Sequence, residues 1–219
     1  MLLATQAKTM LVLQDKMNAK VNPDWLAVKS PFLRAVVIEG AEAIEHHGWK
    51  WWKKQDCDLA QLQMELVDIW HFLLSDLLIQ ADGDFSLAEQ AIFADIDQDS
   101  VSFDGKDYPF SSLTLLDKLE LMIGLSAAKR TNIGLFSTLL TDCQMDWNEL
   151  YAQYVSKNVL NFFRQDNGYK EGTYIKEWGG KEDNEHLVEI MAKLDATAEE
   201  YQDLLYQELN KRYQLLNIT

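Results

Sequence analysis

Apolar residues recur along most of the chain with the three- and four-residue spacing of an amphipathic α-helix. The first such stripe covers residues 7–21 and is interrupted by two amides, Gln14 and Asn18. A second helix is predicted from Ser30 to about Gly48, because serine is favoured at an N-cap and the proline that follows it is favoured at the first helical position. The chain therefore opens with two predicted helices.

Helical signals continue through the middle of the chain. A third helix is predicted from Asp56 or Asp58 to about Gln80, where the sequence ADGD ends it. The sequence SLAE (86–89) is a capping box and predicts a shorter helix. Turn-forming residues in 98–111 make this stretch the one expected place for a small hairpin or an extended loop.

The remaining pattern is also helical. The sequence TLLD (114–117) predicts another capped helix, which reaches about Arg130 before the sequence TNIG breaks the pattern. Asp146 is expected to cap a long helix that ends before Gly168, since glycine is common just past a helix C-terminus. A loop rich in glycine and charge (168–184) and one or two further helices are predicted to follow.

Composition supports one helical fold. The chain has 219 residues, of which 47% are hydrophobic and 25% charged, as in ordinary globular proteins. It has only three prolines and ten glycines, which disfavours an all-β fold. Because no repeat or clear linker interrupts the sequence, we predict a single all-α domain, a helical bundle that spans residues 1–219.

Charge and cysteine content limit the partners and the compartment. The formal charge is −15, so general binding to nucleic acid through phosphates is not expected. Cys57 and Cys143 allow at most one disulfide and lack the spacing of a zinc site. The most apolar run, residues 69–79, contains Asp76 and is too short to span a bilayer. We therefore expect a cytoplasmic protein that lacks a secretory signal and does not cross a membrane.

Two pairs of acidic residues indicate a metal site. Glu42 and Glu45 lie three residues apart on the second predicted helix, and Glu65 and Asp68 have the same spacing on the third. Residues three apart share a helix face, so two antiparallel helices could bring the four carboxylates together. Because such anions repel one another, a divalent cation would stabilise them, and an all-oxygen ligand set suits Mg²⁺, with Mn²⁺ as a substitute.

Two other interpretations of these acids remain open. They could lie on solvated helix faces or pair with lysines, as acidic residues at this spacing often do. A di-iron site is a further alternative, but it requires a Glu-x-x-His motif from each of two helices. Only Asp68 and His71 approach that motif, so iron is the weaker alternative.

A basic helix face follows in the second half of the chain. Lys157, Asn161 and Arg164 align at about 100° per residue, and Lys170 follows just past the predicted helix end. Arginine can contact phosphate through two N–H groups, and lysine acts as a point charge. The alternative is a solvated face that balances nearby acids. Together with the carboxylates, these residues indicate a site for a nucleoside polyphosphate at which a metal ion activates water.

Four residues are candidates for binding a base. Gln14 and Asn18 interrupt an apolar stripe, and an amide can both donate to and accept from the polar edge of a nucleobase. Phe72 follows Asp68 by four residues and could stack on the base, and Trp52 is a candidate second wall. The alternative is that the two amides bond to core backbone groups and that the two aromatic residues pack in the core.

The motifs resemble those of a known family. The pattern ExxE, an interval and ExxD is similar to that of the all-α nucleoside triphosphate pyrophosphatases. Within that superfamily, the sequences KNVLNFFRQDNGYKEG (157–172) and GGKEDN (179–184) resemble the dimeric dUTP pyrophosphatases. One departure is Ala41, where the superfamily often has glutamate, and it leaves Glu42 and Glu45 in place.

The resemblance implies an all-α fold and a magnesium-dependent dUTP diphosphatase that hydrolyses dUTP and dUDP to dUMP and limits uracil incorporation into DNA. It implies a homodimer and adds Tyr169 to the phosphate or sugar contacts. It also implies that the four acids are metal ligands. The alternatives are a pyrophosphatase of the same superfamily that acts on dCTP or another non-standard nucleotide, and a helical scaffold without activity.

Overall fold

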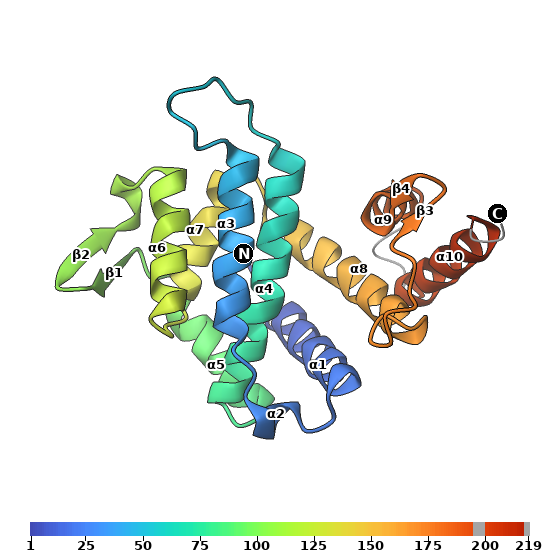
Figure 1. Ribbon diagram of the computed structural model, residues 1–219. Coiled ribbons are helices and arrows are strands. Elements are labelled where there is room, and N and C mark those ends of the chain that lie inside the picture. The colour runs from blue at the N-terminus through green and yellow to red at the C-terminus, as the bar shows by residue number, and fades with distance from the viewer. Residues whose placement is uncertain (195–199, 217–219) are drawn as a thin grey trace.

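The computed structural model describes residues 1–194 and 200–216, and within them the fold is helical, as predicted (Figure 1). The helices are α1 (Ala4–Val21), α2 (Trp25–Val28), α3 (Phe32–His47), α4 (Leu59–Gln80), α5 (Phe85–Asp95), α6 (Leu115–Ala127), α7 (Ile133–Asp142), α8 (Trp147–Asp166), α9 (Asp183–Met191) and α10 (Tyr201–Leu216). Two antiparallel hairpins pair β1 (Ser100–Phe103) with β2 (Lys106–Pro109) and β3 (Glu177–Trp178) with β4 (Lys181–Glu182).

Helix α4 is the centre of the bundle. It contacts α1, α3, α5 and α8, which explains why its sequence is apolar on several sides instead of along one stripe. Trp70, fully buried on α4, stacks on Phe136 of α7 with ring centroids 5.0 Å apart. Helix α3 lies alongside α4 and also contacts α6, so the apolar core extends on both sides of α3.

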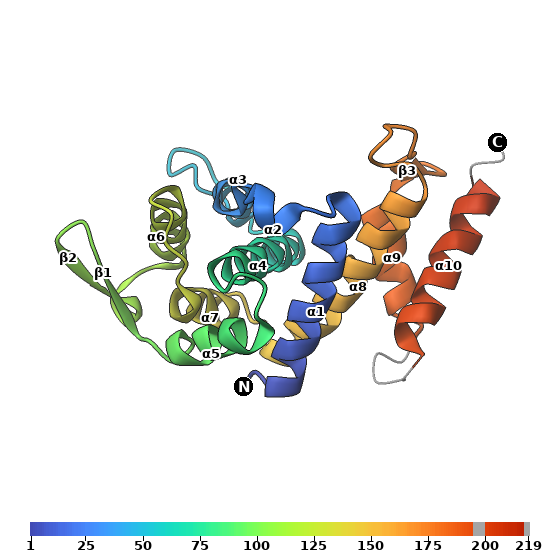
Figure 2. The ribbon, with the colours of Figure 1, turned by 90° about the horizontal axis from the view of Figure 1, so that it is seen from below.

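The C-terminal elements lie on one side of the molecule. Helices α9 and α10 pack along α8, at the end of the structure opposite the β1–β2 hairpin (Figures 1 and 2). Helix α8 contacts α1 and α4 as well, and it therefore joins the N-terminal helices to the C-terminal ones. None of the described helices is long and apolar enough to cross a membrane.

Several predicted helix ends are confirmed. The side chains of Thr114 and Asp117 form a reciprocal capping box at the start of α6, and the Asp146 side chain caps α8. Asp58, the later of the two predicted starts, caps α4. Gly168 follows the end of α8 with a φ of +89°, a conformation that glycine adopts without the strain a Cβ would cause. The hairpin predicted within 98–111 is β1–β2.

Other expectations were wrong. Pro31, not Ser30, occupies the N-cap of α3, and its ring cannot accept a hydrogen bond from the helix. The cap of α5 is Asp84, whose side chain accepts hydrogen bonds from the backbone N–H groups of Ser86 and Leu87, so the helix begins two residues earlier than the sequence SLAE indicated. Helix α7 and the β3–β4 hairpin were not predicted. The two cysteines are both free.

Candidate active site

Carboxylates gather where α3 and α4 lie side by side. Glu39 and Glu42 from α3 and Glu65 from α4 each offer an oxygen within 4.8 Å of the others. Asp68, one turn after Glu65, lines the same cavity, which has a volume of about 370 Å³. We call these four residues the acidic cluster. Among the described residues no histidine belongs to this group, although His46 Nε2 lies 3.4 Å from Glu65 Oε1.

Two carboxyl groups of the acidic cluster have raised pKa values, because their ionised forms are destabilised there. Burial, followed by the charges of neighbouring carboxylates with Asp68 first, raises the pKa of Glu39 to about 8. The same two causes raise the pKa of Glu65 to about 7, although the charge of Lys157 acts in the opposite direction. Lys157 Nζ lies 3.0 Å from Asp68 Oδ2. One buried lysine offsets only part of the charge, so the cluster has the donor set and the electrostatic need for a divalent cation.

Glu45 does not join the acidic cluster. Its carboxylate accepts a 2.7 Å hydrogen bond from Trp49 Nε1 and lies 3.8 Å from Lys50 Nζ, at the exposed end of α3. The pair on α3 that faces α4 is therefore Glu39 and Glu42, one turn earlier than predicted from the sequence. A signal for Glu39 was present, because it follows the buried Val36 by three residues on the apolar stripe of α3.

The predicted phosphate-binding residues line the other wall of this cavity. Lys157, Asn161 and Arg164 from α8, with Tyr169, face the acidic cluster across it. Lys170 lies outside the cavity, and its Nζ donates a 3.0 Å hydrogen bond to the carbonyl of Val21. A phosphate contact from Lys170 would require that bond to break.

Two residues that the sequence did not indicate complete this wall. Lys176 and Asn184 line the same cavity from the segment after α8. Their signal was weak, because a lysine and an asparagine in a charged, glycine-containing stretch are typical of any surface loop. They reach the cavity because the segment after α8 folds back beside that helix, with α9 packed against it.

The guanidinium of Arg164 makes hydrogen bonds to other side chains of the protein. Its Nε and Nη2 each donate a 2.8 Å hydrogen bond to the carboxylate of Asp183, and Nη1 donates to Asn161 Oδ1 at 3.1 Å. The two-donor edge that was expected to bind phosphate is thus occupied by Asp183. Arg164 retains its Nη1 end for an anion in the cavity.

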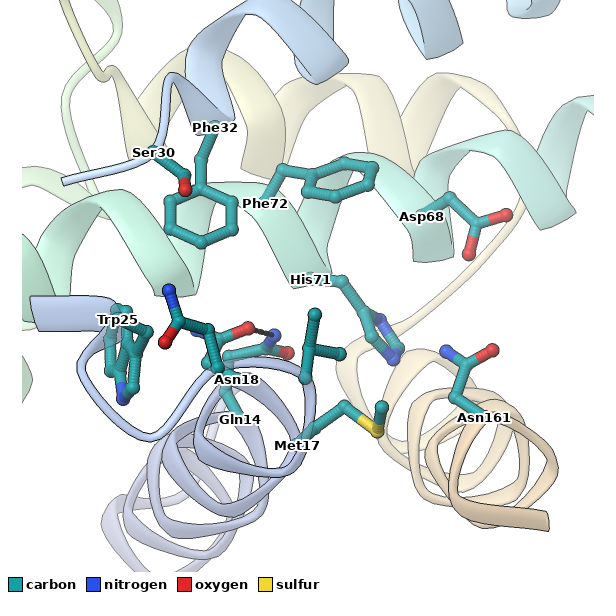
Figure 3. A pocket seen from close by; sticks show the side chains of 12 residues that line it. Gln14, Met17, Asn18, Trp25, Ser30, Phe32, Asp68, His71, Phe72 and Asn161 are labelled. Carbon is teal, nitrogen blue, oxygen red and sulfur yellow. Dashed lines mark hydrogen bonds between the residues drawn. The ribbon is translucent and has the colours of Figure 1, made fainter. Parts of the chain in front are cut away.

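A second cavity of about 270 Å³ adjoins the first (Figure 3). Asp68, Phe72 and Asn161 line both cavities, so a ligand that extends from one to the other would pass these three side chains. Other residues that line the second cavity, mostly apolar or aromatic in character, include Gln14, Met17, Asn18, Trp25, Phe32 and His71.

Aromatic rings form the wall of the second cavity, but not all of those predicted. Phe72 stacks on Phe32, with ring centroids 6.4 Å apart, and Trp25 packs edge-on against Phe32. Trp52 is 59% exposed on the loop between α3 and α4 and packs against Trp49 instead. The structure therefore places Phe72 in the cavity and Trp52 outside it, with Trp25 and Phe32 as additional wall residues.

The two predicted amides form part of a buried hydrogen-bond chain. Tyr154 donates to Gln14 Oε1 at 2.9 Å, Gln14 donates to Asn18 Oδ1 at 3.0 Å, and Asn18 donates to Ser75 Oγ at 3.0 Å. In each of the two amides, these bonds use one N–H of the NH₂ group and one lone pair of the carbonyl oxygen. The second N–H and lone pair remain available for a ligand. The amides thus bond within the core and also line the cavity (Figure 3).

His71 adds a hydrogen-bond acceptor that the sequence did not indicate. Its Nδ1 lies 3.0 Å from the carbonyl of Val67 and therefore carries the hydrogen. Burial lowers the pKa of His71 to about 4, so the ring is neutral near pH 7. Its Nε2 is buried with no partner in the described part of the chain, although the ring lines the second cavity (Figure 3). A buried acceptor of this kind favours a ligand that offers an N–H.

Comparison with known families gives one match. A family model described as dUTPase matches residues 6–169, which is more than half of the chain. None of the curated proteins that were compared with the chain matches it. The matched residues include the whole acidic cluster, the basic face of α8 and the aromatic cavity. They exclude Lys176, Asp183 and Asn184.

Proposed function

Because the chain belongs to the dUTPase family and is therefore a hydrolase that acts on dUTP, we propose a division of roles between its two cavities. The larger cavity holds the polyphosphate and a magnesium ion, and the aromatic cavity holds uracil. The observation that carries this proposal is the pairing of three carboxylates within 4.8 Å with a basic wall on the facing helix. We propose that dUTP and dUDP are both hydrolysed to dUMP, which limits uracil incorporation into DNA.

In this proposal the metal ligands are the four residues of the acidic cluster, Glu39, Glu42, Glu65 and Asp68. Mg²⁺ suits them because all the donors are carboxylate oxygens, and Mn²⁺ is expected to substitute. When bound, the ion supplies Lewis-acid stabilisation of the phosphate and lowers the pKa of a coordinated water. Glu39 and Glu65, which retain protons near neutral pH, would release them on binding the ion.

The residues of α8 that line the larger cavity, with Tyr169, bind the phosphates and the sugar in this proposal. Lys157 is buried, lines the cavity and holds its ammonium 3.0 Å from Asp68 Oδ2, where it can stabilise negative charge that develops on the phosphate. Asn161 lines both cavities, so its amide is placed to contact the sugar or the first phosphate. Arg164 and Tyr169 contact the phosphates farther along.

The base is selected by hydrogen bonds in the aromatic cavity. Uracil carries an N3–H, which the unpaired Nε2 of His71 can accept, whereas N3 of cytosine has no hydrogen and would oppose that lone pair. Asn18 and Gln14 offer the remaining N–H and carbonyl groups to the uracil oxygens. A site built to hydrogen-bond one base rejects another that leaves its polar groups unpaired. Phe72 and Phe32 cover the base or sugar.

The assembly and the compartment are two further parts of the proposal. We propose a homodimer on the basis of the motif resemblance, and a cytoplasmic location because both cysteines are free. Sedimentation equilibrium would test the first, since a monomer mass at micromolar protein would contradict it. Cell fractionation would test the second.

One assay tests the central proposal. Release of pyrophosphate from dUTP, and of phosphate from dUDP, is measured with and without Mg²⁺, and dCTP, dTTP and UTP are assayed separately as alternative substrates. We expect turnover of the two uracil deoxynucleotides that depends on the metal. Faster hydrolysis of dCTP than of dUTP would overturn the base assignment. Full activity with excess chelator would overturn the metal assignment.

A further inference from the structure

Asp183 is a buried carboxylate whose two oxygens both contact the guanidinium of Arg164. It is the first residue of α9 and is completely buried. Its Oδ1 accepts a hydrogen bond from Arg164 Nη2, and its Oδ2 accepts one from Arg164 Nε, both at 2.8 Å. The Tyr174 hydroxyl also donates to Oδ2 at 2.8 Å. Both oxygens are therefore directed at one guanidinium and one hydroxyl.

The charges make this contact an ion pair. Burial alone would raise the pKa of Asp183, but the hydrogen bonds and charge of Arg164, with the Tyr174 hydroxyl, hold it below its ordinary value. Asp183 is thus ionised at neutral pH although it lies inside the protein. Removal of its charge would leave the largely buried Arg164 without a counterion, which is costly in a low-dielectric setting.

The geometry of the pair fixes the direction of the arginine. Two parallel N–H···O bonds hold the plane of the guanidinium, which a single contact would leave free to rotate. Asn161 and Asn184 receive the other hydrogen bonds, from Nη1 at 3.1 Å and from Nη2 at 3.4 Å. One N–H of Nη1 remains, on a side chain that lines the cavity of the acidic cluster.

We infer that Asp183 is a positioning residue for the hydrolysis of the nucleotide, because it holds the guanidinium of Arg164 in the orientation in which Nη1 meets the polyphosphate. The inference rests on the proposed function of the larger cavity. It assigns a role to a residue beyond the stretch that matches the family, since the match ends at Tyr169. The segment after α8 therefore contributes to phosphate binding through Arg164 as well as through its own side chains.

A purely structural role is the competing explanation. The same ion pair fastens α9 to α8, so its loss would also lower stability. The two roles predict different effects of a substitution at Asp183 on ligand binding. A loosened fold weakens binding of every ligand, whereas a misdirected Arg164 weakens only ligands that carry phosphates.

The test compares Asp183→Asn with Tyr174→Phe, a matched control that removes one hydrogen bond to Asp183 but keeps the ion pair. Binding of deoxyuridine and of a non-hydrolysable dUTP analogue is measured by calorimetry with Mg²⁺, and unfolding is followed in parallel. We expect Asp183→Asn to weaken the triphosphate at least ~10-fold, as for loss of an oriented charged hydrogen bond. Deoxyuridine binding should change less than about twofold in both variants. Equal losses for nucleoside and triphosphate, or no loss for either, would overturn the inference.

A double-mutant cycle separates this inference from the function it rests on. If Asp183 acts through Arg164, Asp183→Asn should cause no further loss of triphosphate affinity in the Arg164→Ala protein. Unchanged affinity in Arg164→Ala alone would refute the phosphate role of Arg164. A loss in Arg164→Ala without one in Asp183→Asn would refute only the positioning role. Should Asp183→Asn fail to fold, Asp183→Glu keeps the charge but displaces it, and the same phosphate-specific loss is expected.

Discussion

Three glutamates on α3, each three residues after the last, differ in what they face. Successive positions at this spacing rotate by about 60° around a helix, so Glu39 and Glu45 point about 120° apart. Both cannot face α4, and spacing alone leaves open which two of the three do. The packing of Val36 and Ala43 in the core decides in favour of Glu39 and Glu42.

Glu39→Gln and Glu45→Gln form a matched pair that tests this assignment. We expect turnover of dUTP to fall at least ~100-fold in Glu39→Gln, because a metal ligand loses its charge. Glu45→Gln should retain nearly normal turnover, since the contacts of its carboxylate within residues 1–194 and 200–216 are with Trp49 and Lys50. Steady-state kinetics at saturating Mg²⁺ would measure both. The reverse order of effects would restore Glu45 as a ligand.

Asn18→Ala tests base selection against core packing. Because Asn18 both bonds to Ser75 and lines the aromatic cavity, we expect the preference for dUTP over dCTP in kcat/KM to fall at least ~10-fold. Asn158→Ala is the control, as Asn158 is a buried amide on α8 that lines neither cavity. It should lower stability and leave the preference unchanged. If Asn18→Ala behaves like the control, its amide belongs to the core alone.

At the scale of helices and strands, the features that depend on neighbouring residues in the sequence were predicted correctly. The caps at Thr114 and Asp146 and the hairpin within 98–111 were found because each depends on residues a few positions apart. Helix α7 was missed because Gly134 and its neighbours resemble a break. Gly134 is there for packing, since a Cβ would lie 2.6 Å from the carbonyl oxygen of Gln98.

The same distinction applies to the site. The i, i+3 acids and the face of α8 were visible in the sequence, and the resemblance they suggested is confirmed by the family match. Trp25 and Lys176 were not visible, because they reach the cavities only when distant segments pack together. Asp183 and Asn184 belong to the sequence GGKEDN (179–184), but the contact of Asp183 with Arg164 spans two helices and was not predicted.

Two glycines test this account of packing. Gly134→Ala should lower the free energy of unfolding by about 1–3 kcal/mol, because the methyl group meets backbone that cannot easily move. Gly124→Ala, within α6, would meet only a side-chain atom of Phe103 at 3.5 Å and should stabilise by up to ~1 kcal/mol through helix propensity. Urea denaturation measures both. Equal effects would contradict the packing role of Gly134.

At the scale of the whole molecule, the acidic cluster couples stability to pH and to metal. The pKa values of Glu39 and Glu65 rise from 4.5 to about 8 and about 7, so the folded state holds protons that the unfolded chain has lost. Stability should therefore fall as pH rises through this range. His71, with its pKa lowered from 6.5 to about 4, acts in the opposite direction but only below about pH 6.5.

The clearest window is thus from about pH 6.5 to about pH 8.5, without metal. Over it we expect the melting temperature to fall, and we expect Mg²⁺ to restore it most at the higher pH, where it no longer competes with protons. Glu65→Gln should flatten the dependence. A melting temperature that rises across this window without metal would contradict the raised pKa values.

We propose that residues 1–219 unfold as one domain, because α8 packs against α1 and α4 on one side and α10 on the other. A single urea transition should then be seen both by circular dichroism and by the near-ultraviolet signal of the aromatic residues around Phe163. Two separated transitions would show that the C-terminal helices form an independent unit.

The loop between α3 and α4 also has an optical consequence. Trp51 and Trp52 are 86% and 59% exposed on it, whereas the four tryptophans outside the loop (Trp25, Trp70, Trp147 and Trp178) are buried. A neutral quencher such as acrylamide would therefore collide chiefly with indoles of this one loop, which begins directly after the helix that carries Glu39 and Glu42. The quenchable fraction of the native fluorescence is thus a label-free signal from the loop that joins the two helices of the acidic cluster. A titration with metal or nucleotide could be followed by it in the unmodified protein.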